Sequence, residues 1–188
     1  FGGGNGNTFS GYASGGWGDG NTFTGYASGG WGGNNNFTGG YSGGWGTGLK
    51  VKSYASAVIG SYNDSTNAAD PTAYNSANRV FQIGIGTADN ARANAMTVLQ
   101  GGNVGIGTNT PSRLLHVVGK SLFTDSLKYS LGASNGYVLT SDASGNATWQ
   151  VSAAGNLAAY TKQQDPITLA TFGAGARFQA DTAAFTDS

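Results

Sequence analysis

The sequence predicts an all-β, elongated fold in which short repeats stack into a β-roll or β-solenoid. Three observations favour this class: a fourteen-residue repeat in the N-terminal third, 34 glycines among 188 residues, and alternating apolar residues in the middle of the chain. Glycine destabilises a helix by about 1 kcal/mol relative to alanine, whereas it permits tight corners and close backbone approach. The aromatic content of 12% and the charged content of only 10% argue against disorder.

The repeat is marked by aromatic residues that return at a spacing of fourteen. The third copy carries a one-residue slip at Gly39-Gly40-Tyr41-Ser42, and a degenerate fourth copy keeps the frame as far as Ile59. Residues 1–61 are therefore predicted to form the solenoid, because fourteen residues suit two short strands and two turns, and each coil buries its inner face only against its neighbours. The aromatic residues of the first three copies are Phe9, Tyr12, Trp17, Phe23, Tyr26, Trp31, Phe37, Tyr41 and Trp45.

These nine aromatic residues are the candidate site residues, and two interpretations of them are open. They form the core and the stacking contacts between coils, or they form exposed rows that stack on a glycan or contact a receptor. Regular Thr and Asn residues on a flat solenoid face are also typical of ice-binding surfaces, but here the aromatic residues interrupt any flat Thr array.

The first two repeats resemble the head repeat of trimeric autotransporter adhesins of the YadA type. They read N-T-F-S-G-Y-A-S-G-G-W-G-D-G from Asn7 to Gly20 and N-T-F-T-G-Y-A-S-G-G-W-G-G-N from Asn21 to Asn34. That family's repeat also has fourteen residues, with a Gly, a Ser three later and a Gly four after that. The aromatic Phe-Ser or Phe-Thr pairs stand where the family has Ala-Ile, so the packing is expected to differ from its left-handed β-roll. The matching residues are Gly11, Ser14 and Gly18, and then Gly25, Ser28 and Gly32.

The middle of the chain is predicted to contain two β-rich modules after a polar connector at residues 62–78, which includes Pro71. In the first module, residues 79–119, a strand over residues 80–86 has alternating apolar residues, and Gly101-Gly102-Asn103 is a hairpin turn before a further strand. In the second module, residues 120–152, two strands flank a Ser/Gly/Asn turn.

These modules resemble shaft elements of phage tail fibres and of secreted bacterial surface proteins. The resemblance is carried by G-N-V-G-I-G-T at residues 102–108, T-P at 110–111, L-H-V at 115–117 and G-Y-V-L-T-S-D-A-S-G-N-A-T-W at 136–149. It implies a trimeric shaft. A homotrimer also agrees with the thin, Gly-rich modules, which bury little apolar surface alone and hide their sheet edges by association.

The C-terminal part is predicted to change character. Residues 153–166, rich in Ala, are the best helical segment and are expected to be a short neck or a linker. Residues 167–188 are predicted to begin a β domain, because A-R-F-Q-A-D-T-A-A-F at 176–185 resembles the first strands of a jelly-roll head of the tumour-necrosis-factor type. The chain is interpreted as a segment of a longer polypeptide.

The sequence offers no arrangement typical of catalysis. His116 is the single histidine, cysteine is absent, and the nine acidic residues are scattered. We therefore expect no enzyme activity, cofactor or metal, although a trimer would bring three copies of His116 together at an axis. The stretch from Asp142 to Asn146 lacks EF-hand spacing and is predicted to be a turn. The zero net charge and the lack of a long apolar run predict neither nucleic-acid binding nor membrane insertion.

The resemblances imply a function in attachment. The expected protein is a fibre or spike on a phage virion that binds a host-surface glycan or protein receptor and joins other virion proteins through regions outside this segment. The alternative is a trimeric adhesin on a bacterial cell surface or secreted from it. A polysaccharide depolymerase on a fibre is a third class, but it needs a carboxylate cluster that the sequence does not show.

Overall fold

The computed structural model describes residues 1–66 and 70–152, and it places residues 1–122 and the residues from 123 onward in two separate units. All regular secondary structure in these described ranges is β-strand, which confirms the all-β prediction. The neck expected at 153–166 and the C-terminal β domain expected at 167–188 lie outside the described residues.

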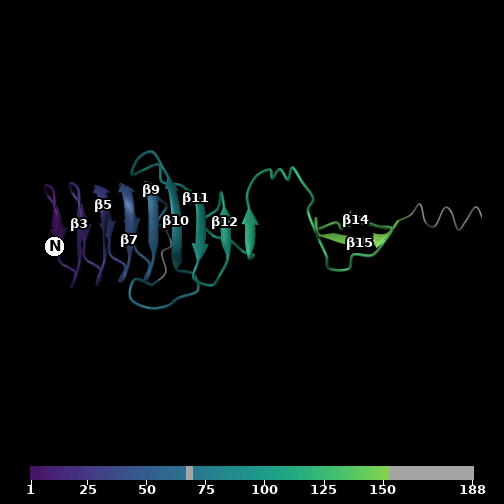
Figure 1. The fold of residues 1–188 in the computed structure, drawn as a ribbon, viewed down its shortest axis with the longest axis horizontal. Coiled ribbons are helices and arrows are strands. Elements are labelled where there is room, and N and C mark those ends of the chain that lie inside the picture. Colours follow the sequence, from purple (N-terminus) through teal and green to yellow (C-terminus); the bar gives the residue numbers. More distant parts are fainter. Residues whose placement is uncertain (67–69, 153–188) are drawn as a thin grey trace, which may run out of the picture. The chain divides into compact units, whose positions relative to one another are not determined.

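The first unit begins as a β-solenoid whose coils carry two parallel sheets (Figure 1). Each coil contributes a two-residue strand to sheet B and a strand of two to five residues to sheet A, and equivalent strands pair in register fourteen residues apart. This confirms the predicted β-solenoid. Sheet B consists of β2 (Thr8–Phe9), β4 (Thr22–Phe23), β6 (Asn36–Phe37) and β8 (Lys50–Val51); the coil strands of sheet A are β1 (Gly2–Gly3), β3 (Gly15–Trp17), β5 (Gly29–Gly33), β7 (Gly43–Thr47) and β9 (Ala57–Ser61).

Sheet A continues beyond the repeats without interruption. Strand β10 (Arg79–Ile85) pairs parallel to β9, and β11 (Asn94–Leu99) and β12 (Val104–Ile106) then follow as antiparallel neighbours. Strand β13 (Leu115–Val117) is the last strand of the sheet and pairs parallel to β12. The hairpin expected at residues 101–103 is confirmed, and the first predicted shaft module shares one nine-stranded sheet with the repeats.

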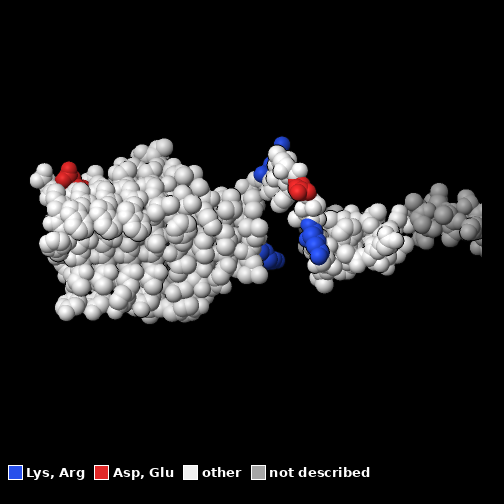
Figure 2. All heavy atoms as spheres, viewed as in Figure 1, with Lys and Arg blue, Asp and Glu red and all other residues white. Residues whose placement is uncertain are grey.

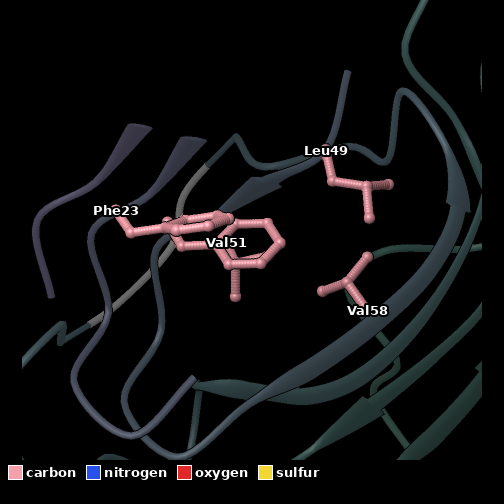
Figure 3. Packing of buried hydrophobic residues seen from close by; sticks show 5 residues of the cluster. Phe23, Leu49, Val51 and Val58 are labelled. Atoms are coloured by element: carbon pink, nitrogen blue, oxygen red, sulfur yellow. The ribbon is translucent and has the colours of Figure 1, made fainter. Parts of the chain in front are cut away.

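The core of the solenoid lies between the two sheets (Figure 3). The phenylalanines of sheet B point inward, where Phe23 and Phe37 have no exposed surface. Glycine faces them from sheet A: a Cβ on Gly30 would lie 2.7 Å from the ring of Phe37 and 2.2 Å from the carbonyl oxygen of Gly44. Ring and backbone therefore both exclude a side chain there. In the fourth coil the core is aliphatic and consists of Leu49, Val51 and Val58.

A row of buried asparagines runs along the solenoid at the same period. The Oδ1 atom of Asn21 accepts a hydrogen bond from the Asn35 backbone N–H at 3.1 Å, and its Nδ2 donates to the carbonyl of Gly32 at 2.8 Å. Asn7 and Asn35 make the same contacts in their own coils. Each side chain thus gives a hydrogen-bond partner to one backbone N–H and one backbone carbonyl, as buried polar groups require.

The predicted connector at residues 62–78 folds back onto the coils. The carbonyl of Pro71 accepts a hydrogen bond from the Gly40 N–H at 2.7 Å, and the carbonyl of Asp70 accepts one from the Tyr54 N–H at 2.9 Å. Where the connector rejoins the sheet, the buried Arg79 guanidinium donates a hydrogen bond to the carbonyl of Asp64, near the start of the connector, at 2.8 Å. The segment is therefore a wall of the third and fourth coils.

The second unit contains one antiparallel hairpin, formed by β14 (Tyr137–Ser141) and β15 (Ala147–Val151). Its turn is organised by Asp142, whose Oδ1 accepts hydrogen bonds from the backbone N–H groups of Ser144 and Asn146 at 2.8 Å each. The Asn146 side chain and these backbone groups hold the pKa of Asp142 below its ordinary value. Both the predicted hairpin and the predicted turn are confirmed.

Candidate functional site

The structure separates the nine candidate aromatic residues into three rows with different surroundings. The phenylalanine row is internal: Phe23 and Phe37 are fully buried and Phe9 packs against them, so this row is core and offers no binding surface. The tryptophan row and the tyrosine row are exposed, and every member of both is at least 46% accessible. Each phenylalanine lies on the inner face of sheet B, each tryptophan lies on the outer face of sheet A, and the tyrosines lie in the turns that join the two sheets.

The tryptophan row lies on the outer face of sheet A. The indoles of Trp17 and Trp31 stack at 5.6 Å with an angle of 8°, and those of Trp31 and Trp45 stack at 5.6 Å with an angle of 4°. Both faces of the central indole are therefore covered by its neighbours. The row presents ring edges to its surroundings, which suits packing against an apolar surface better than stacking on a flat ligand.

The tryptophans belong to the first of two apolar rows that cross sheet A from β3 to β13. Strand pairing places each residue of a row directly beside the next. With neighbouring strands about 4.8 Å apart, the seven gaps between the eight strands from β3 to β13 give rows roughly 34 Å long. The first row is Trp17, Trp31, Trp45, Ile59, Ile83, Met96, Ile106 and Val117; the second is Gly15, Gly29, Gly43, Ala57, Phe81, Val98, Val104 and Leu115.

Neither row contains a charged residue, although their side chains are half-buried or exposed. Figure 2 shows a face of residues 1–122 that is almost entirely uncharged, with an acidic group near its N-terminal end and a basic group at the opposite end. A monomer rarely exposes a contiguous apolar patch larger than a few hundred Å². The outer face of sheet A is therefore an uncharged, largely apolar surface.

A trough runs along the second row where its residues are glycines. It has a volume of about 560 Å³. The tryptophans form one wall and Ala13, Ala27 and Tyr41 lie along the other, with the glycines as the floor. A glycine row between bulkier rows leaves a channel with the same spacing along the solenoid as the indoles themselves.

The tyrosine row lies at the corner before sheet A, and its regularity fails at the third coil. The backbone keeps the fourteen-residue register, because Tyr41 N–H donates to the Tyr26 carbonyl as Ala27 N–H donates to that of Tyr12. The predicted one-residue slip thus affects side chains only: Tyr41 takes the alanine position, and Gly40 takes the tyrosine position.

This exchange opens a groove between the coils. Tyr12 and Tyr26 stack at 5.3 Å with an angle of 12°, whereas the ring of Tyr41 is inclined by 56° to Tyr26 and by 78° to Tyr54. The groove has a volume of about 360 Å³. Its lining consists of Thr24, Gly25, Tyr26, Thr38, Gly40, Tyr41, Tyr54, Pro71 and Thr72.

The other residues considered for binding or catalysis have the following surroundings in the described part of the chain. His116 lies on β13, and its Nδ1 accepts a hydrogen bond from the Ser112 N–H at 3.4 Å. In residues 1–66 and 70–152 no three His, Cys, Asp or Glu side chains are grouped so that they could hold a metal ion. Gly84 and Gly105 lie where backbone segments approach closely, since a Cβ on Gly84 would be 2.6 Å from the carbonyl oxygen of Ser61 and one on Gly105 would be 2.6 Å from that of Thr108. Within the same ranges there is no helix with the length and apolar character needed to span a bilayer.

Two features of the site were missed by the sequence analysis. The asparagine row was visible as a third fourteen-residue period, at Asn7, Asn21 and Asn35, but polar residues in a Gly-rich repeat suggest turns. The groove depends on the order of Gly40 and Tyr41. That signal was present in the sequence, where it was interpreted as a shift of the repeat.

Comparison with known proteins adds no family to this description, since no protein-family model, curated protein or solved structure matches the chain.

Proposed function

We propose that this chain is a segment of a homotrimeric extracellular fibre or spike that is displayed on a phage virion and attaches it to the host surface. The role is structural and adhesive, without catalysis or cofactors. The observation that carries the proposal is the outer face of sheet A, where two uncharged apolar rows remain open to solvent in a single chain. Copies of the chain that cover this face with one another remove that surface from water.

Association of identical copies fits this face for two physical reasons. Every copy carries both the tryptophan row and the glycine trough at the same inter-coil spacing, so ridges and channels are matched in period. The absence of charge removes the desolvation cost that opposes burial of ionised groups. The number three comes from the resemblance of the repeats and shaft elements to trimeric fibres.

A bacterial trimeric adhesin, on the cell surface or secreted, is the second candidate. It is favoured by the strict fourteen-residue stacking of parallel coils, which is also the period of the YadA-type head repeats that the sequence resembles. The two candidates share the same physical architecture and differ in whether the fibre is attached to a phage virion or comes from a bacterial cell.

Sedimentation equilibrium of the full chain tests the association. We expect a species of three times the chain mass of 18.9 kDa. Leu115 belongs to the second apolar row and is 64% exposed, so Leu115→Asp leaves the monomer folded and places a charge in the interface. This variant is expected to dissociate the trimer. Tyr74→Asp, at an aromatic residue of the connector that is 66% exposed, is the matched control and should remain trimeric.

Binding of labelled protein to a panel of intact bacterial cells tests attachment. The wild-type chain is expected to label at least one strain. A monodisperse monomer at micromolar concentration contradicts the trimer, and a failure to label any strain contradicts attachment through this segment.

A further inference from the structure

The groove at the third coil arises from a residue order that backbone energetics disfavour. Tyr41 has a φ of 53°, in the left-handed region that costs a non-glycine residue about 1–2 kcal/mol. Gly40, which would adopt that conformation freely, stands one position earlier, where φ is not in that region. The reverse order would relieve the strain. The equivalent residues Ala13, Ala27 and Ala55 have φ values of 57°, 48° and 50°, so this backbone conformation is common to the coils, and only the tyrosine side chain at residue 41 is particular to the third coil.

The exchange has a direct consequence for the tyrosine row. In the other coils a tyrosine ring fills the corner, and at the third coil a glycine leaves that space empty. The ring of Tyr41 then stands across the row, inclined to both Tyr26 and Tyr54, so aromatic faces border the gap. The carbonyl of Pro71, held by the Gly40 N–H, fixes the connector as the opposite wall.

We propose that this groove binds one ring of a neutral saccharide. This inference rests on the proposed attachment function and names the ligand class of one site within it. The groove volume of about 360 Å³ lies in the range of small-molecule sites, which is roughly 300–1,000 Å³.

The lining has the chemistry that a sugar ring requires. The C–H bonds on one face of a pyranose pack on an aromatic face, while its hydroxyl groups need donors and acceptors at the rim. Six of the nine lining residues carry a hydroxyl group, namely Thr24, Tyr26, Thr38, Tyr41, Tyr54 and Thr72. None of the nine is charged, which favours a neutral sugar over an anionic one. A proline-rich peptide also packs on aromatic grooves, but it has fewer polar groups than a sugar to pair with the six hydroxyl groups of the lining.

The wall is held by hydrogen bonds rather than by packing alone. Asp70 Oδ1 accepts from the Thr72 N–H at 2.8 Å, from the Thr72 hydroxyl at 2.9 Å and from the Ala73 N–H at 3.0 Å. These contacts fix the turn that presents Pro71 and Thr72 to the groove. The site is therefore organised before a ligand arrives, which lowers the entropy cost of binding.

A double variant that restores the regular order, Gly40→Tyr with Tyr41→Ala, provides the sharpest test. A Cβ at residue 40 would meet Pro71 O at 3.5 Å and Tyr54 Cδ2 at 3.6 Å, which are ordinary contacts, so the backbone has room for the first atom of a side chain there. The new ring fills the groove and alanine stands at residue 41, as in the neighbouring coils. Tyr12→Ala removes an exposed tyrosine of the same row outside the groove and is the matched control.

The full-length wild-type chain and both variants are applied to an array of neutral hexose and N-acetylhexosamine oligosaccharides, with a polyproline peptide as a further probe. We expect the wild type and Tyr12→Ala to bind a neutral saccharide and the double variant to lose at least tenfold in affinity, with unchanged circular dichroism. Saccharide binding that survives in the double variant overturns the site, and binding of polyproline alone overturns the ligand class.

The cell-labelling experiment separates this inference from the proposed function. If wild-type protein labels cells but binds no neutral saccharide, the groove proposal fails and attachment stands. If it labels no cells at all, attachment fails, and saccharide binding on the array then reports the groove alone.

Discussion

Replacing Asn35 with alanine removes the side chain that joins the third and fourth coils through their backbones. Its Oδ1 accepts a hydrogen bond from the Leu49 N–H at 2.9 Å, and its Nδ2 donates to the Gly46 carbonyl at 2.9 Å. The residue is only 1% exposed, so water does not replace either partner. A buried backbone group without a partner costs about 1–3 kcal/mol. For two such groups we expect a loss of about 3 kcal/mol in the free energy of unfolding.

Urea unfolding of the full chain, at fixed protein concentration, measures this loss. Tryptophan fluorescence, to which Trp45 of the third coil contributes, reports the transition. Asn7→Ala is the matched control because Asn7 makes equivalent contacts at the half-buried first rung, where solvent substitutes for the amide. We expect it to cost about 1 kcal/mol or less. Equal losses for the two variants, or a loss below about 1 kcal/mol for Asn35→Ala, would refute the reasoning that burial makes the asparagine row stabilising.

Two further predictions concern the core and the connector. Phe37→Ala empties a fully buried position and is expected to lower the free energy of unfolding by about 3–5 kcal/mol, measured in the same urea experiment; a loss below about 1 kcal/mol contradicts the described core. Hydrogen bonds from the Thr72 N–H and hydroxyl hold the pKa of Asp70 below its ordinary value of 3.8. Its stabilisation of the turn is therefore complete above pH 3.8 and is lost as the pH falls through the lower folded-state pKa. The amide resonance of Thr72 should titrate below pH 3.8, and a midpoint at or above that value contradicts the contact.

Local patterns in the sequence predicted the elements of the fold well. The spacing of Phe9, Phe23 and Phe37 established the coil length, and alternation at Phe81, Ile83 and Ile85 predicted β10. The turn between β14 and β15 followed from its Ser/Gly/Asn composition. Such features depend on backbone preferences within a few residues and on a repeat that returns at a fixed interval.

The candidate site was predicted only as a set of residues. The sequence could not divide the nine aromatic residues into a core row and two surface rows, because that division depends on which face of each sheet points into the solenoid. It also gave no sign that β10 to β13 extend the sheet of the repeats. Pairing between β9 and β10 crosses the connector, and long-range pairing of this kind leaves little trace in local sequence.

The amino-acid sequence by itself determined the period, the strand-forming segments and the lack of charge, because these are properties of composition and spacing. Tertiary structure alone decided that two apolar rows align into one open face and that Pro71 closes the groove beside Gly40. The physical reason is that a surface or a cavity exists only where segments distant in sequence are brought together, and packing between coils determines which side chains remain outside.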